Sequence, residues 1–354
     1  MRIAQVSPLY EAVPPRLYGG TERVVANLCD ALVQLGHQVT LFASAEAQTT
    51  AQLVPVRERA IRLDPAPLKS DLAAHMNQLA EVRARADEFD VIHFHTDIIH
   101  FPFFEDMAAS TLTTLHGRLD LHDLPGIFDR WSAFPLVSIS HSQRRHLPAA
   151  NWAGTVHHGV STDLYDFHPQ SRGYLAFLGR ISPEKRPDRA IAIAKRMGRR
   201  LRVAAKVDKI DQTYFEEKIE ALLHHPLIDF VGEIGDRQKS EFLGGADALL
   251  FPIDWPEPFG LVMIEAMACG TPVVAFDCGS VREIVEPGLT GYVVNSEEEA
   301  AWAVEQAVKL DRAAVRRRFE ERFSAPAMAR GYLDLYARSQ TLRGPTFVQK
   351  ALTA

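Results

Sequence analysis

The chain has 354 residues, of which 47% are hydrophobic and 24% charged, and its formal net charge is −6 at pH 7. This length suits two domains that each bury a core, and the composition is ordinary for a soluble globular protein. The negative charge excludes a general attraction to nucleic acid, and no apolar run approaches the roughly 20 residues that cross a bilayer.

The cysteines and the N-terminal residues bear on the cellular compartment. Only three cysteines occur, Cys29, Cys269 and Cys278, and a small, odd number of dispersed cysteines favours a reducing environment. The first eight residues lack the apolar core of a signal peptide. We therefore expect a cytoplasmic protein that is at most peripheral to a membrane.

Metal-binding patterns are absent from the sequence. No Asp-x-Asp occurs, and none of the 14 histidines forms the i, i+4 pair of a helical zinc site. We expect no metal and no cofactor. Seven histidines are predicted to be surface or loop residues: His100, His122, His146, His157, His158, His224 and His225.

The first half alternates short apolar runs with helical periodicities, which is typical of a parallel α/β sheet. The expected helices include an amphipathic one over residues 68–89. The expected strands are residues 2–7, 38–43, 60–63, 90–95, 111–115 and 136–140.

Three features of the first half lie after predicted strands. Gly19 and Gly20 follow the first strand and precede a helix, the place where an α/β fold puts phosphate-binding turns. Their spacing is not G-x-G-x-x-G, which disfavours a nicotinamide cofactor. A turn that needs positive φ is the alternative explanation of the pair. His95 and His116 each end a later strand, so both are candidate site residues.

The second half repeats the strand–helix alternation, after an expected linker at residues 163–173. Arg316, Arg317 and Arg318 stand among acidic residues and are predicted to form a solvated helix face. A loose tail is expected from Gly344. The expected strands are residues 174–178, 201–205, 228–231, 248–252, 272–276 and a closing strand within 288–294.

A basic loop follows the first strand of this half. Arg180 and Lys185 lie between that strand and the next helix, where an arginine grips a phosphate with two parallel hydrogen bonds and a lysine acts as a point charge. Together they would neutralise a diphosphate. A solvated basic loop is the alternative, and Arg186 is expected to be solvated.

A second strand–loop–helix unit, from Ala248 to Phe276, carries two glutamates. Glu257 lies in the loop, bracketed by prolines, and Glu265 lies about two turns into the expected helix at residues 259–268. The first turn, Phe259, Gly260, Leu261 and Val262, offers amides with no partner inside the helix, which favour an anion. The alternative is an ordinary amphipathic helix with a solvated Glu265.

These residues carry a family resemblance. The run Glu257-Pro-Phe-Gly-Leu-Val-Met-Ile-Glu265, with Ala266 to Ala275 after it, resembles the E-x7-E signature of retaining glycosyltransferases of family 4. Gly179 to Lys185 resembles the G-R-x-x-x-x-K signature of the same family. The segment at residues 156–160 resembles its Asn-Gly-Val-Asp segment, with His158 where asparagine is usual.

The resemblance implies the GT-B fold, in which two Rossmann-like, doubly wound parallel-sheet domains face a cleft. The expected domains are residues 1–165 on the acceptor side and residues 172–325 for the nucleotide-sugar. Residues 326–354 would form a helix that returns to the first domain, and a tail.

The resemblance also implies roles for individual residues. Arg180 and Lys185 would bind the donor diphosphate, Glu257 the donor sugar, and His116 would lie near the reactive carbon. Those four are the expected catalytic residues. Further substrate-binding residues are expected at Gly19, Gly20, Ile234, Phe259, Gly260, Leu261, Val262 and Glu265.

The expected activity is metal-independent transfer of a hexose, with retention, from a nucleoside-diphosphate sugar to a hydroxyl of a saccharide, lipid or small molecule. UDP-glucose is favoured as donor, with GDP-mannose as the second candidate. A sugar-nucleotide 2-epimerase and a non-catalytic sugar-nucleotide-binding protein are the alternatives. The sequence leaves the acceptor, the linkage and the oligomeric state open.

Overall fold

The structure is a computed structural model that describes residues 1–17 and 19–342. The tail predicted from Gly344 lies outside these residues. Within the described part, no helix is both long enough and apolar enough to cross a membrane.

The chain divides into two compact units. The first comprises Met1–Gly159 together with the C-terminal helix α13 (Ala325–Leu342), and the second comprises Val160–Ser324. The stretch expected as a linker at residues 163–173 is part of the second unit. Tyr165 is buried there, and its hydroxyl donates a hydrogen bond to Glu265 at 2.8 Å.

The first unit contains a seven-stranded sheet with the order β3-β2-β1-β4-β5-β6-β7, and every pair of neighbouring strands is parallel. The strands are β1 (Arg2–Val6), β2 (Gln38–Ser44), β3 (Gln52–Arg57), β4 (Val91–Phe94), β5 (Thr111–Thr114), β6 (Leu136–Ser138) and β7 (Trp152–Thr155). The helices besides α13 are α1 (Gly20–Gln34), α2 (Asp71–Ala84), α3 (Leu124–Arg130) and α4 (His141–Arg144), with short 3₁₀ turns η1 (Ala86–Glu88), η2 (Phe101–Phe103) and η3 (Glu105–Ser110).

The two edge strands of this sheet differ from the sequence prediction. The strand predicted at residues 60–63 is wrong, since these residues form turns; β3 lies earlier, at Gln52–Arg57. Neither β3 nor β7 contains a fully buried residue, so their sequences lack the apolar run of a central strand. Pro55 within β3 is compatible with its place at the edge.

The second unit contains a six-stranded parallel sheet with the order β10-β9-β8-β11-β12-β13. The strands are β8 (Tyr174–Arg180), β9 (Leu201–Lys206), β10 (Ile228–Gly232), β11 (Ala246–Phe251), β12 (Val273–Phe276) and β13 (Gly291–Val294). The helices are α5 (Pro187–Met197), α6 (Gln212–Tyr214), α7 (Glu220–Leu223), α8 (Asp236–Gly244), α9 (Leu261–Ala268), α10 (Val281–Ile284), α11 (Glu297–Ala307) and α12 (Arg312–Arg322), with the 3₁₀ turn η4 (Lys209–Asp211) and the π-helical turn η5 (Phe215–Ile219).

Both sheets are doubly wound, as predicted. In each, strand order reverses once, between β1 and β4 in the first unit and between β8 and β11 in the second. The central strands are buried along almost their whole length because helices cover both faces of a parallel sheet. Ligands of such sheets bind outside the carboxyl ends of the strands, at the point of reversal.

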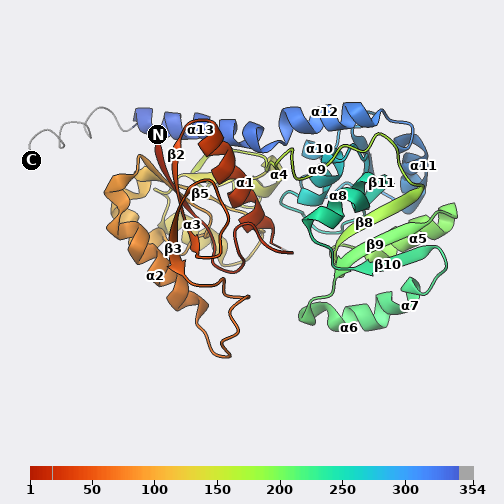
Figure 1. The fold of residues 1–354 in the computed structure, drawn as a ribbon, viewed down its shortest axis with the longest axis horizontal. Helices are drawn as coiled ribbons and strands as arrows, with labels where there is room; N and C mark the ends of the chain where they lie inside the picture. The colour runs from red at the N-terminus through yellow and green to blue at the C-terminus, as the bar shows by residue number, and fades with distance from the viewer. Residues whose placement is uncertain (18, 343–354) are drawn as a thin grey trace, which may run out of the picture. The chain divides into compact units, whose positions relative to one another are not determined.

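Helix α13 completes the first unit although it follows the second unit in the chain. It lies beside α1, so that the first and last helices of the described chain are neighbours (Figure 1). Its Tyr332 and Tyr336 are fully buried. The core of the first unit therefore depends on residues from both ends of the sequence.

Candidate functional site

The predicted site residues of the second unit lie at its point of strand reversal. Arg180 ends β8, Lys185 follows it, and Glu257 follows β11, the strand paired with β8. Since the strands are parallel, both loops leave the same edge of the sheet. The fold thus brings together two predicted motifs that are more than 70 residues apart in sequence.

Lys185 and Glu257 form a direct ion pair, with Lys185 Nζ donating a hydrogen bond to Glu257 Oε2. Trp255 Nε1 donates to the same oxygen at 2.9 Å. The Lys185 ammonium also lies 5.2 Å from the Trp255 ring centroid and 5.7 Å from that of Phe251, which adds cation–π attraction. Only 11% of the Glu257 side chain is exposed, so this carboxylate is held rather than solvated.

A third loop supports the backbone of Glu257. Ser280 N–H donates to the Glu257 carbonyl at 3.0 Å, and Ser280 Oγ donates to the Phe259 carbonyl at 2.7 Å. Gly279 has φ +59°, and a Cβ at this position would lie 2.3 Å from the Glu257 carbonyl oxygen. Only glycine permits this approach, so the loop after β12 fixes the position of Glu257.

The guanidinium of Arg180 is surrounded by carboxylates at long distances. It lies 3.5 Å from Glu184 and 3.7 Å from Asp208 and from Asp211, beyond ordinary hydrogen-bond length. Arg180 Nε and the nearby Ser182 Oγ are buried and have no hydrogen-bond partner in the described part of the chain. The loop after β8 therefore keeps donors available for an anion.

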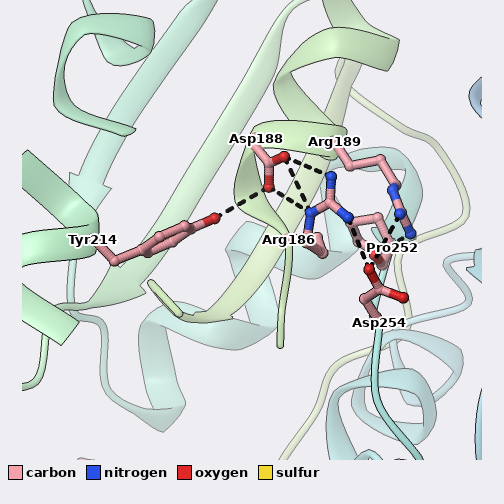
Figure 2. Close-up of polar contacts among 6 residues, drawn as sticks. All are labelled: Arg186, Asp188, Arg189, Tyr214, Pro252 and Asp254. Carbon is pink, nitrogen blue, oxygen red and sulfur yellow. Dashed lines mark hydrogen bonds and ion pairs between the residues drawn. The ribbon is translucent and has the colours of Figure 1, made fainter. Parts of the chain in front are cut away.

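Arg186 is not solvated, which corrects the sequence prediction. Its guanidinium lies between Asp188 and Asp254, and Arg189 reaches Asp254 and the Pro252 carbonyl, as Figure 2 shows. Tyr214 donates a hydrogen bond to Asp188 at 3.2 Å. The hydrogen bonds that Arg186 donates to the Asp188 carboxylate raise the pKa of Arg186 above its ordinary range.

This cluster joins the loop after β8 to the loop after β11. Arg186 adopts a left-handed backbone conformation at φ +51°, which is uncommon for a residue with a Cβ. The Asp254 N–H also donates to the Glu184 carbonyl at 2.9 Å. The two loops that carry Lys185 and Glu257 are thus held to each other by charge and by backbone hydrogen bonds.

Glu265 is buried, so the alternative of a solvated residue on an amphipathic helix is wrong. Its Oε1 accepts hydrogen bonds from the Tyr165 hydroxyl at 2.8 Å and from Lys239 Nζ at 3.1 Å. Both contacts are long-range, and neither partner has a recognisable sequence signature. A buried carboxylate that already binds a cation and a hydroxyl is an organised acceptor.

The helix after Glu257 begins later than predicted. Gly260 is in the left-handed region at φ +84° and caps α9, which starts at Leu261 rather than at Phe259. Phe259 is buried, whereas Leu261 and Val262 are half-buried. The first turn of α9 lies in the loop region of Glu257, where its free amides attract negative charge.

The remaining predicted residue of this unit, Ile234, lies farther from the reversal point. It is half-buried in the turn after β10, the edge strand beyond β9. Lys206, at the end of β9, pairs with Asp208 at 2.9 Å. The contacts between residues therefore join Lys185 to Glu257 but leave Ile234 apart.

The predicted residues of the first unit lie at its own reversal point. Gly19 caps α1, at the end of the loop that follows β1, and Gly20 begins the helix. A Cβ on Gly19 would lie 2.7 Å from Pro15 Cβ, and its φ is +156°. Glycine is therefore required here by the turn itself, which agrees with the structural alternative. The turn nevertheless presents the first amides of α1 at the carboxyl edge of the sheet.

His95 and His116 follow the paired strands β4 and β5 and contact each other. His95 Nδ1 and His116 Nε2 are 2.8 Å apart. Burial lowers the pKa of His116 to about 3, so its imidazole is neutral at physiological pH. The ring of His158 lies parallel to that of His116, with centroids 5.1 Å apart.

Two sequence predictions about basic residues are wrong in part. His100 and His158, expected at the surface or in loops, are buried. Arg316 is not part of a solvated face, because its guanidinium donates to the carbonyls of Tyr165, Thr162 and Ala268. Arg316 satisfies main-chain acceptors inside its unit, and His100 pairs with the Thr113 hydroxyl at 2.9 Å, which sequence periodicity does not reveal.

Two family models match the chain. One, described as Glycosyltransferase Family 4, matches residues 18–212, which is more than half of the chain. The other, described as Glycosyl transferases group 1, matches residues 167–323.

Curated relatives carry related names. A phosphatidyl-myo-inositol mannosyltransferase of Mycobacterium leprae (strain TN) is 27% identical over 336 residues, covering 86% of each chain. A D-inositol 3-phosphate glycosyltransferase of Mycobacterium bovis (strain BCG / Pasteur 1173P2) is 34% identical over 170 residues, covering 42% of this chain and 34% of the relative.

Solved structures share the fold over 96% of this chain. A glycosyltransferase involved in avilamycin A biosynthesis superposes with a TM-score of 0.75 at 24% identity and 98% coverage of that chain. A sucrose-phosphate synthase from Thermosynechococcus elongatus gives 0.76 at 19% identity and 98% coverage. With its two doubly wound parallel sheets, the chain has the GT-B fold and belongs to glycosyltransferase family 4.

Proposed function

We propose that this glycosyltransferase transfers a hexose, with retention of configuration and without a metal, from a nucleoside-diphosphate sugar to an acceptor hydroxyl. The second unit would hold the donor, and the first the acceptor. The observation that carries the proposal is the pairing of Lys185 with Glu257 at the strand reversal, where Arg180 ends strand β8. This grouping supplies separate partners for a diphosphate and for a sugar.

The cations would stabilise the leaving group. As the bond between sugar and diphosphate breaks, negative charge grows on the diphosphate, and Arg180, Lys185 and the first amides of α9 attract that charge. A well-aimed donor of this kind contributes roughly 2.7–4 kcal/mol to lowering a barrier. Among the described residues, neither Arg180 Nε nor Ser182 Oγ has a hydrogen-bond partner, which supports this assignment because both are donors.

Glu257 would bind a hydroxyl of the donor sugar and Glu265 the ribose. The Glu257 carboxylate accepts from Lys185 and Trp255 through one oxygen, Oε2, so Oε1 remains able to accept from a sugar. Retention by double displacement would need a carboxylate nucleophile opposite the leaving group. We assign that role to no residue, and propose that the acceptor attacks from the face that the diphosphate leaves.

UDP-glucose is the favoured donor and GDP-mannose the second candidate. The relatives named mannosyltransferases support the second, whereas one structural neighbour, 16% identical and solved in complex with UDP-glucose, supports the first. A screen of UDP- and GDP-hexoses for nucleoside diphosphate release, with and without sugar and inositol acceptors, tests the proposal. NMR of the product would report the anomeric configuration, and product formation from donor alone would instead indicate an epimerase.

Replacing Lys185 by alanine is expected to weaken binding of the free nucleoside diphosphate, measured by calorimetry, by about tenfold or more, because a charge-assisted hydrogen bond contributes roughly 1.5–3 kcal/mol. Lys195→Ala is the matched control, since Lys195 is exposed on α5. Equal affinity of Lys185→Ala and wild type for the nucleoside diphosphate would refute the proposal that Lys185 binds it.

Chelation is expected to leave transfer intact. The cations at 180 and 185 would supply the electrostatic stabilisation that a divalent ion supplies in metal-dependent transferases. The rate in excess EDTA should therefore equal the rate in added Mg²⁺. Complete loss of transfer in EDTA, restored by Mg²⁺, would disprove metal independence.

A further inference from the structure

A series of buried hydrogen bonds in the first unit ends at His116. Its members lie on β1, on β4 and β5 or just after them, and on α13, and all except His116 are nearly or fully inaccessible to solvent. The series runs through His116, His95, Gln5, Tyr336, His93, Thr114 and Tyr332.

The first half of the series joins His116 to the sheet. His95 Nδ1 lies 2.8 Å from His116 Nε2, and His95 Nε2 lies 2.8 Å from Gln5 Oε1. Gln5 is on β1 and pairs in register with His93 of β4, two residues before His95. The three side chains therefore project from adjacent strands on one face of the sheet.

The second half joins Gln5 to the C-terminal helix. Gln5 Nε2 donates to the Tyr336 hydroxyl at 3.0 Å, and that hydroxyl lies 2.8 Å from His93 Nδ1. His93 Nε2 is 2.7 Å from Thr114 Oγ1, which is 2.9 Å from the Tyr332 hydroxyl. Tyr332 and Tyr336 are four residues apart, so both face the sheet from one side of α13.

Every member of this series is neutral. Burial lowers the pKa of His93 and of His95 well below the ordinary range, and it raises the pKa values of Tyr332 and Tyr336. A neutral imidazole has one N–H and one lone pair. Each imidazole in the series must therefore donate a hydrogen bond through one nitrogen and accept one through the other. The tautomer of one ring then determines the tautomer of the next.

The amide of Gln5 sets the direction. Its Oε1 accepts from His95 and its Nε2 donates to Tyr336. His95 must then carry its proton on Nε2 and accept through Nδ1, and His116 must carry its proton on Nε2. The other nitrogen, His116 Nδ1, is buried and has no hydrogen-bond partner in the described part of the chain.

We propose that Gln5 and His95 are positioning residues that hold His116 in the Nε2–H tautomer, so that Nδ1 accepts a hydrogen bond from a hydroxyl of the bound sugar or acceptor. The Tyr336 hydroxyl of α13 accepts from Gln5 Nε2 and lies 2.8 Å from His93 Nδ1, so the hydrogen bonds that hold the amide reach the C-terminal helix. The role in transfer rests on the proposed function, whereas the tautomer does not. Reversing the Gln5 amide would reverse every bond and leave a donor, not an acceptor, at Nδ1.

The tautomer is measured directly by ¹⁵N NMR of histidine-labelled protein, in which protonated and unprotonated ring nitrogens resonate apart. The His116 signals are assigned by their loss in His116→Gln. In the wild type we expect a proton on Nε2 and none on Nδ1. A proton on Nδ1 would overturn the proposal, without any need for an active preparation.

Two variants test the control of that tautomer. Tyr336→Phe frees the Gln5 amide to rotate, and Gln5→Met removes the acceptor of His95, so each should add a second His116 signal with the proton on Nδ1. Tyr174→Phe is the matched control, because its buried hydroxyl bonds the Phe242 carbonyl at 2.7 Å in the other unit. An unchanged His116 spectrum in both variants would refute the proposal that Gln5 and Tyr336 determine the His116 tautomer.

Turnover supplies the last readout. With an active donor and acceptor pair, Gln5→Met should lower kcat about tenfold, the scale of one hydrogen bond, with little change in donor KM. If Gln5→Met keeps the full wild-type kcat although its His116 tautomer is altered, the tautomer has no part in the reaction. If the wild type transfers no hexose, the proposed function fails while the tautomer result stands alone.

Discussion

Replacing Glu257 by alanine is expected to lower kcat for hexose transfer by about 10²- to 10³-fold, the loss that follows removal of one well-aimed polar group. Binding of the free nucleoside diphosphate should remain measurable, because Arg180, Lys185 and the first amides of α9 are retained. Steady-state kinetics with the best donor and calorimetry with the diphosphate check the two statements separately.

The expected loss follows from the neighbours of Glu257. The carboxylate is nearly buried and is held by Lys185 and Trp255, so its removal takes from both partners the acceptor that orients them. Glu298→Ala is the matched control, since its side chain is 65% exposed and pairs with Arg196 on the surface. Such surface pairs contribute little. Unchanged turnover in Glu257→Ala would remove this residue from the site.

Replacing Gly279 by alanine is expected to lower transfer by about 10²-fold, the effect of misplacing a catalytic group by about 1 Å. A Cβ there would lie 2.3 Å from the carbonyl oxygen and 2.4 Å from the nitrogen of Glu257. Because these are backbone atoms, the Glu257 segment has to move. The left-handed backbone adds about 1–2 kcal/mol of strain, so the melting temperature should also fall.

Gly288→Ala separates the effect of backbone strain from the effect of moving the Glu257 segment. Gly288 has a comparable φ of +78°, but a Cβ there meets nothing within 4 Å. This variant should lose stability by the strain alone and keep full transfer. Equal activity of Gly279→Ala and Gly288→Ala, measured with the same donor, would show that Gly279 does not position Glu257.

Much of the fold could be predicted from the sequence because local signals suffice for it. Apolar runs predicted every strand of the second sheet, and its central strands β8 and β11 are buried over most of their length because helices cover both faces. The loops that carry Arg180, Lys185 and Glu257 followed from turn residues between strand and helix. The edge strands β3 and β7 were missed, and neither contains a fully buried residue, whereas the edge strands β10 and β13 of the second sheet each do.

The partners of the candidate site residues could not be predicted. Nothing in the sequence around Glu257 indicates that it pairs with Lys185, 72 residues earlier, or that Gly279 supports its backbone. Glu265 was expected near a ribose, but nothing indicated Tyr165 or Lys239. The series through His116 depends on Tyr336, which is 331 residues from Gln5.

The sequence alone determined two α/β halves and the loops that carry the chemistry, because periodicity and turn residues act over a few neighbouring positions. That both sheets are doubly wound was implied by the family resemblance. Only the tertiary structure decided which side chains are buried, which charges are paired and which way a buried imidazole is protonated. Those properties depend on contacts between strands and helices that are remote in the chain, where solvent exclusion makes each hydrogen bond constrain the next.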